Sequence, residues 1–265
     1  MRGLPIFIVG SWNCLRTRMV QIEPSPFIQL STFYLGEFMN IQELVNNQLT
    51  NEQNNRATRE RSGKYNPGSL GRCFRLQYFN RLNEPITNPP EERNLRVMKC
   101  GSIFHDIIQT LVLKENPLIQ KEVIVETEDF KGYADLVDDG VSDIKTIHSK
   151  GFNYLSPETI AKEKYTNWMQ VLFYAWKLGK KYAKLVFVSK DDLRIEEYRE
   201  ELDNYWLNEL DMEETKLKYY WGAKTLPPAQ PRAFNGKDCT YCNWLNRCKE
   251  IEGLKHPTLT KGAVK

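Results

Sequence analysis

The sequence predicts an α/β protein in which helices flank a mixed central sheet. Segments with helical apolar spacing alternate along the chain with short β-favouring runs. The 265 residues are 41% hydrophobic and 27% charged, a composition typical of a soluble globular chain with one large domain or one domain with extensions. No apolar run reaches the roughly 18 residues that a spanning helix needs, so we expect a cytoplasmic protein without membrane contact.

The first 38 residues differ in composition from the rest of the chain. They are poor in charge and rich in Phe, Ile and Leu, whereas Met39 begins a polar segment. Either translation starts at Met39, or the leader is an ordinary extension. We divide the chain into this extension (1–38), a polar N-terminal segment (39–68), a core (69–230) and a basic, cysteine-rich segment (231–265).

The core shows nine secondary-structure signals in order. The breaker Pro67-Gly68-Ser69 precedes the first helix, and a proline-rich connector follows the last. We predict helices over 70–82 and 91–113, a meander of strands over 119–127, 130–137 and 141–146, a helix over 157–179, strands over 184–189 and 193–198, and a helix over 200–221. Cys73 and His105 are therefore expected on helices.

Two aspartates and a lysine lie on the predicted meander. Asp135 ends one strand and Asp143 lies on the next, so the tight turn between them would set the two carboxylates side by side. Because strand side chains alternate, Lys145 shares a face with Asp143 while Ile144 packs into the core. Such carboxylates favour magnesium or manganese, which can make a water nucleophilic. A solvated turn explains an isolated Asp-x-Lys equally well.

Helical pairs flank the meander on both sides. Gly101 and His105 lie one turn apart before it, and Gln170 and Tyr174 lie one turn apart after it. Taken singly, His105 would be a packed helix histidine, and Gln170 and Tyr174 would be ordinary helix residues.

Together these motifs resemble the RecB-like branch of the PD-(D/E)XK nuclease superfamily. The ordered set is Gly101-x-x-x-His105, Gly132-x-x-Asp135, Asp143-x-Lys145 and Gln170-x-x-x-Tyr174. The resemblance covers residues 69–250 and implies a restriction-endonuclease-like core with Mg- or Mn-dependent deoxyribonuclease activity.

The resemblance also implies a role for each motif residue. His105, Asp135, Asp143 and the backbone carbonyl of Ile144 would bind the metal. Asp135, Asp143 and Lys145 would be catalytic, and Gln170 and Tyr174 would orient DNA or the active site.

Four cysteines bracket this core. The late set Cys239-x2-Cys242-x5-Cys248 is spaced too closely for disulfides in a cytoplasmic protein, and Cys73 is the candidate fourth ligand. Ligand type and spacing fit either a [4Fe-4S] cluster or tetrahedral zinc. The set resembles the CRISPR-associated iron-sulfur exonucleases and their helicase-nuclease relatives, which implies a [4Fe-4S] cluster. Cys14 and Cys100 are left as free thiols.

The C-terminal part is basic and aromatic. Residues 216–265 carry ten Lys or Arg against three acidic residues, although the net charge of the whole chain is only +3. Cations of this kind hold phosphates and rings stack bases. A solvated basic tail with inward-packed rings fits as well. The interleaved rings are Tyr219, Tyr220, Trp221, Phe234, Tyr241 and Trp244.

These features predict a metal-dependent nuclease, specifically a single-stranded DNA exonuclease of DNA repair, recombination or CRISPR spacer acquisition. The chain has no Gly-x4-Gly-Lys-Ser/Thr phosphate loop, so it is not itself an ATP-driven helicase. The alternative is a DNA-binding adaptor that hands DNA ends to a partner integrase or helicase. A sequence-specific endonuclease is a third possibility.

Overall fold

The computed structural model describes residues 40–59 and 61–253, so the predicted extension and Cys14 lie outside the described residues. Every element named below belongs to one unit of the chain, Ile41–Lys265. Within the described ranges, no helix has both the length and the apolar character needed to cross a membrane.

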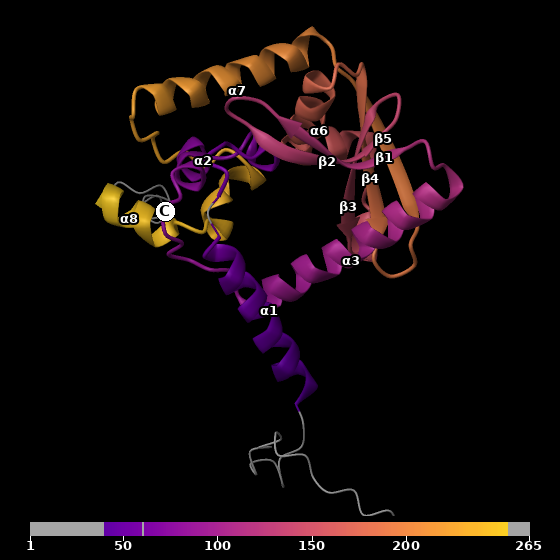
Figure 1. Ribbon diagram of the computed structural model, residues 1–265, viewed down its shortest axis with the longest axis horizontal. Helices are drawn as coiled ribbons and strands as arrows, with labels where there is room; N and C mark the ends of the chain where they lie inside the picture. Colours follow the sequence, from indigo (N-terminus) through magenta and orange to yellow (C-terminus); the bar gives the residue numbers. More distant parts are fainter. Residues whose placement is uncertain (1–39, 60, 254–265) are drawn as a thin grey trace, which may run out of the picture. The chain divides into compact units, whose positions relative to one another are not determined.

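This unit contains helices on both sides of a five-stranded sheet (Figure 1). The strands are β1 (Gln120–Glu126), β2 (Lys131–Val137), β3 (Val141–Ile147), β4 (Tyr182–Ser189) and β5 (Ile195–Glu201). The helices are α1 (Ile41–Ala57), α2 (Phe74–Arg81), α3 (Glu92–Glu115), α4 (Ser149–Phe152), α5 (Pro157–Glu163), α6 (Tyr165–Lys177), α7 (Asn204–Gly222) and α8 (Leu245–Glu252). Short 3₁₀ turns occupy Pro67–Ser69, Phe234–Gly236 and Asp238–Tyr241.

The sheet is mixed, as the sequence predicts. Its strand order is β1-β2-β3-β4-β5, with β1 to β3 forming the expected antiparallel meander. β3 and β4 are parallel, because the chain returns through α4, α5 and α6, and β5 then adds an antiparallel edge. The α/β class with helices flanking a mixed sheet is thereby confirmed.

Two predicted helix boundaries were wrong. The expected helix over 157–179 is divided at Lys164, whose backbone (φ −109°, ψ 20°) leaves the helical region between α5 and α6. The last helix begins at Asn204 and not at residue 200, since Glu200 and Glu201 extend β5 by pairing with β4. Asp203 then caps α7 by accepting a hydrogen bond from the backbone N–H of Trp206.

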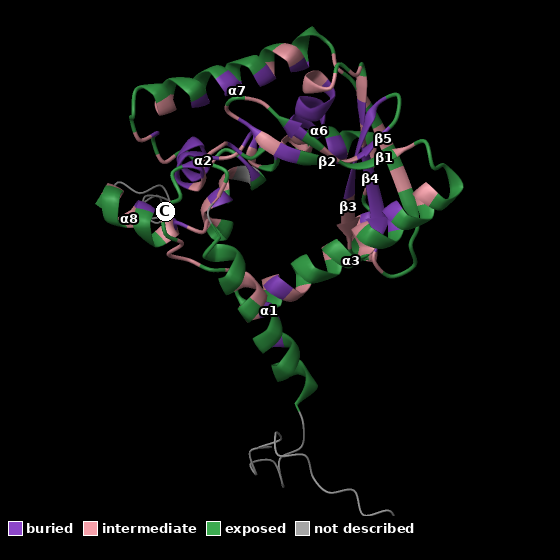
Figure 2. Cartoon of the chain, viewed as in Figure 1, coloured by how far each residue is buried: buried purple, intermediate pink, exposed green. Residues whose placement is uncertain are grey.

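Opposite faces of the sheet pack against different helices, so the central strands β3 and β4 are largely buried, as the purple segments of Figure 2 show, whereas the edge strands β1 and β5 are mostly exposed or half-buried. On the α6 side, the rings of Phe130 and Phe173 lie 4.8 Å apart between centroids within a large buried cluster. On the α3 side, Ile144 and Val186 pack against Ile108. Each such side chain contributes about 1.5 to 3 kcal/mol through burial, so both helices are firmly placed.

The polar N-terminal segment contributes the helix α1, which the sequence reasoning did not single out. It lies against the first half of α3, where Leu49 and Leu95 are both buried. Lys99 of α3 donates to Glu52 of α1 at 3.1 Å. Most of its remaining surface is exposed.

Candidate active site and cysteine site

β2 and β3 separate where the two predicted aspartates would face each other. The two strands pair only beside the turn, at Leu136 with Ser142 and at Val137 with Val141. If the pairing continued by one more residue, Asp135 would lie opposite Asp143. There the backbone N–H of Ile144 donates to Oδ2 of Asp135 at 2.7 Å. A backbone N–H that loses its strand partner needs another acceptor. The carboxylate of Asp135 therefore sits in the opening between the strands.

His105 reaches the same opening from α3. Its Nε2 atom lies 2.9 Å from the carbonyl oxygen of Ile144 and 3.0 Å from Oδ2 of Asp135. Adjacent ligands held about 2.1 Å from one octahedral cation are roughly 3.0 Å apart. His105 Nε2 thus lies from each of the two oxygens at the spacing of adjacent ligands of one small divalent cation, and the three atoms belong to the ligand set that the resemblance implies.

The electrostatics of His105 follow from the same contacts. Burial alone would lower its pKa, but the hydrogen bond and charge of Asp135, together with the bond to the Ile144 carbonyl, raise the pKa above its ordinary value. A ligating imidazole must be neutral at the nitrogen that binds the metal. A proton and a cation therefore compete for this position.

Asp143 and Lys145 form a second polar pair, on the α6 side of β3. The ammonium of Lys145 lies 2.8 Å from Oδ1 and 2.6 Å from Oδ2 of Asp143, and 3.4 Å from Oε1 of Gln170. Asp143 is only 1% exposed. Burial raises its pKa to about 6, with Lys145 opposing the shift and Asp135 adding to it. Ile144, between them in sequence, points to the core on the other face.

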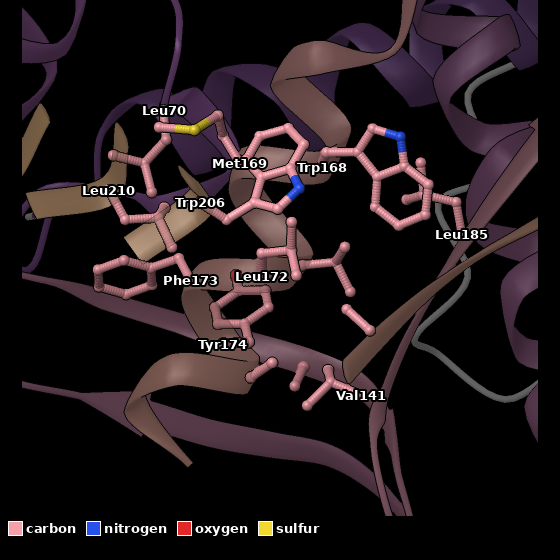
Figure 3. Close-up of a cluster of buried hydrophobic side chains, with 14 of the residues drawn as sticks. Leu70, Val141, Trp168, Met169, Leu172, Phe173, Tyr174, Leu185, Trp206 and Leu210 are labelled. Carbon is pink, nitrogen blue, oxygen red and sulfur yellow. The ribbon is translucent and has the colours of Figure 1, made fainter. Parts of the chain in front are cut away.

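Tyr174 forms the inner wall of the site. It is 2% exposed and lies in the core cluster shown in Figure 3, beside Phe173. Loss of solvation raises its pKa, the charge of Asp143 adds to the shift, and a hydrogen bond with Gln170 opposes it. A Cβ atom at Gly132 would lie only 2.5 Å from the Tyr174 hydroxyl, so the close approach of β2 to α6 requires glycine there.

Two polar residues at the site were missed by the sequence reasoning. The ligand atoms of His105, Glu122 and Asp135 all lie within 4.8 Å of one another. Gln109 of α3 donates from Nε2 to Oε1 of Glu122 at 2.7 Å and to the backbone oxygen of Asp135 at 3.2 Å. The register of the first hairpin would have indicated Glu122, because it pairs the residues on either side of Glu122 with those on either side of Asp135.

An open pocket lies over these groups. Along its β2 wall, Lys131, Tyr133 and Asp135 follow one another at every second position and so share one strand face. Tyr133 is 48% exposed. The wall thus presents a cation, a ring and a carboxylate in sequence along one strand.

The four predicted cysteines line a single cavity. Cys73, Cys239, Cys242 and Cys248 share a small pocket whose other walls are mainly apolar. All four thiols are free, as is the exposed Cys100. Cys73 is the N-cap residue of α2 and not part of the helix, which differs from the expectation.

The chemistry of this cavity fits a metal group bound by thiolates. Burial raises the pKa of Cys239 to about 11 and that of Cys242 to about 12, and neighbouring thiols add to both shifts. Thiols of this kind bind a cation by losing their protons. Arg75 donates to the sulfur of Cys248, and the backbone N–H of Trp244 to the sulfur of Cys242, each at 3.4 Å. Such donors stabilise metal-bound sulfur.

Buried carboxylates attach the cysteine segment to the core. Asp238, 1% exposed, accepts hydrogen bonds from the backbone N–H groups of Cys73, Arg232 and Ala233. Glu213 of α7 forms an ion pair with Arg232 at 2.6 Å. The two ends of the predicted core are therefore joined by hydrogen bonds as well as by the cysteine cavity.

The aromatic residues of the basic segment divide into two groups. Tyr220 and Trp221 pack against the main core, and Trp244 is 3% exposed beneath the cysteine cavity. Tyr219, Phe234 and Tyr241 stay exposed. Three of the six rings are therefore packed inward, as one of the two sequence-based interpretations has it, and three are exposed as the other requires.

A scan of protein-family models and a search of curated proteins find no match to this chain. Among solved structures, SSO0001 is 20% identical with a TM-score of 0.49, and the alignment covers 79% of this chain and 96% of that one. The alkaline exonuclease LHK-Exo of Laribacter hongkongensis is 16% identical (TM-score 0.43; 61% and 89% covered), and a phage-related exonuclease of Haemophilus somnus 129PT is 16% identical (0.40; 48% and 71%).

Proposed function

We propose that this protein is a metal-dependent DNA nuclease. The observation that carries the proposal is the convergence of His105 Nε2, Asp135 Oδ2 and the Ile144 carbonyl at 2.9 to 3.0 Å, beside the Lys145–Asp143 pair. Cleaving a phosphodiester requires an activated water and stabilisation of the charged phosphate. A cation site next to a half-buried lysine supplies both.

Each predicted residue has a role in this proposal. His105, Asp135, Asp143 and the Ile144 carbonyl would hold magnesium or manganese, which would act as a Lewis acid and lower the pKa of a bound water. Lys145 would stabilise negative charge on the scissile phosphate as it develops.

Residues of α6 position the lysine. Gln170 accepts from Lys145 at 3.4 Å and shares a hydrogen bond with Tyr174. Because Tyr174 is buried, this chain of contacts fixes the ammonium group relative to the sheet. Gln170 and Tyr174 would thus act through Lys145 and through the DNA that contacts it.

We propose single-stranded DNA, degraded from an end, as the substrate, and a cytoplasmic role in repair, recombination or CRISPR spacer acquisition, alone or beside an integrase or helicase. The open pocket supports a single strand, because Lys131 can hold a phosphate and the exposed ring of Tyr133 can stack a base next to Asp135.

We also propose that Cys73, Cys239, Cys242 and Cys248 hold a [4Fe-4S] cluster with a structural role, with zinc as the alternative occupant. Support comes from their shared cavity, its apolar walls and the N–H donors that face two of the sulfurs. The group would tie α2 to the segment around α8.

The test is digestion of end-labelled single-stranded and duplex DNA with manganese by anaerobically purified protein. Lys145→Ala should lose cleavage but still bind DNA, whereas Lys162→Ala, an exposed lysine on α5, should cut as the wild type does. The ladders from the two labelled ends would give the polarity, and a single cut in duplex DNA would indicate a sequence-specific endonuclease. Tight DNA binding without cleavage by the wild type would favour the adaptor function.

A further inference from the structure

Glu122 occupies a specific place in the first hairpin. The β1–β2 register pairs Lys121 with Leu136 and Val123 with Ala134, so Glu122 stands opposite Asp135. Residues directly opposite on antiparallel strands have Cβ atoms roughly 5 Å apart. Two carboxylates at so short a distance repel each other unless a cation lies between them.

The backbone at Glu122 is in an unusual conformation. Its φ of 50° lies in the left-handed region that residues other than glycine rarely adopt, and it falls inside a strand. Such strain costs about 1 to 3 kcal/mol and persists where surrounding contacts enforce it. At Glu122 this backbone conformation interrupts the hydrogen-bond ladder between β1 and β2, and it lets the Glu122 side chain turn towards His105 and Asp135.

Gln109 holds Glu122 in this position. It is 2% exposed, and one amide nitrogen donates both to Oε1 of Glu122 and to the backbone oxygen of Asp135. A buried amide that orients two groups at the same site is typical of the residues that support metal ligands.

We propose that Glu122 is a direct ligand of the divalent cation, together with His105 and Asp135. This inference rests on the proposed function. The ligand atoms of the three side chains lie within 4.8 Å of one another, close to the separation of roughly 4.3 Å between opposite ligands of one octahedral ion. Asp143 contacts Lys145 through both carboxylate oxygens, whereas Glu122 supplies a carboxylate that pairs with no lysine within residues 40–59 and 61–253.

The test is manganese binding, followed by the electron paramagnetic resonance of free Mn²⁺, for the wild type and for Glu122→Gln. Loss of residues that merely support a ligand lowers metal affinity 10- to 100-fold. We expect Glu122→Gln to weaken Mn²⁺ binding at least tenfold. Asp106→Asn is the matched control, because it removes one negative charge from the same pocket, and its affinity should stay within about twofold of the wild type.

Glu122 is exposed, so the substitution should fold, and equal melting temperatures in EDTA would establish this. Wild-type affinity in Glu122→Gln together with weakened binding in Asp135→Asn would overturn the inference and leave the proposed function intact. An equal loss in Asp106→Asn would also overturn it, since charge alone would then explain the effect. Failure of the wild type itself to bind Mn²⁺ would instead contradict the proposed function.

Discussion

The backbone N–H of Cys73 donates a hydrogen bond to the carboxylate of Asp238, 165 residues later in the chain, at 3.2 Å. The same carboxylate accepts from Arg232 and Ala233, so one buried side chain satisfies three backbone donors. Removing a buried charged partner typically costs 3 to 5 kcal/mol.

Asp238→Ala should therefore lower the free energy of unfolding by about 3 to 5 kcal/mol and reduce the metal content of the cysteine site. Urea unfolding monitored by tryptophan fluorescence would measure the first effect and elemental analysis the second. Asp139→Ala, at the exposed β2–β3 turn, should change stability by less than about 0.5 kcal/mol. Equal stability of both variants would contradict the attachment described here.

Cys73→Ser should lose bound metal, because it removes one of the four thiols that line the cavity. Iron and sulfide analysis together with the visible absorbance of the anaerobic protein would measure the loss. Cys100→Ser is the control, since that thiol is exposed and lies outside the cavity. Full iron content in Cys73→Ser would exclude Cys73 as a ligand, and zinc in the wild type would identify the other occupant.

Gly132→Ala should destabilise the protein and impair cleavage. Its Cβ would lie 2.5 Å from the Tyr174 hydroxyl and 3.0 Å from Cδ of Pro67, and overpacking of this kind costs about 1 to 3 kcal/mol. At Gly101 the nearest atom, Oγ1 of Thr146, is 3.6 Å away, so Gly101→Ala should fold equally well or gain up to about 1 kcal/mol from better helix propensity. Thermal melts of both variants would measure the change in stability. Equal destabilisation of the two variants would argue against the close contact between Gly132 and Tyr174.

Manganese affinity should fall as the pH is lowered through the raised pKa of His105. Affinity falls with pH because only the neutral imidazole binds the cation. Since the pKa of His105 is raised, protons compete with the cation for the imidazole already near neutral pH. Titration calorimetry in buffers of different ionisation enthalpy should detect proton release on binding at pH 6 to 7. His105→Gln should bind more weakly at every pH and lose that part of the proton release.

The order and type of the core elements could be predicted because they depend on local patterns. Because side chains alternate between the two faces of a strand, Asp143 and Lys145 could be predicted on one face of β3, where they form an ion pair. Helix ends were less accurate, since Glu200 and Glu201 carry no strand signal and join β5 only by pairing with β4.

The site residues that the sequence did not indicate join the site only through contacts between secondary-structure elements. Glu122 is an unremarkable surface glutamate by composition, and it becomes part of the site only through hairpin register and the amide of Gln109. Likewise, nothing local distinguishes the buried Trp244 from the exposed Tyr241, because the difference depends on packing against Phe79.

The distance along the chain between Cys73 and its partners also has a consequence for biosynthesis. At the usual 5 to 20 residues per second, a ribosome needs roughly 10 to 30 seconds to add the residues between Cys73 and Asp238. The thiol of Cys73 therefore exists without its three partner thiols throughout that interval. With the metal group proposed above, loading would be a late step, and a ribosome that stalls before Cys239 would yield a chain that cannot complete the site.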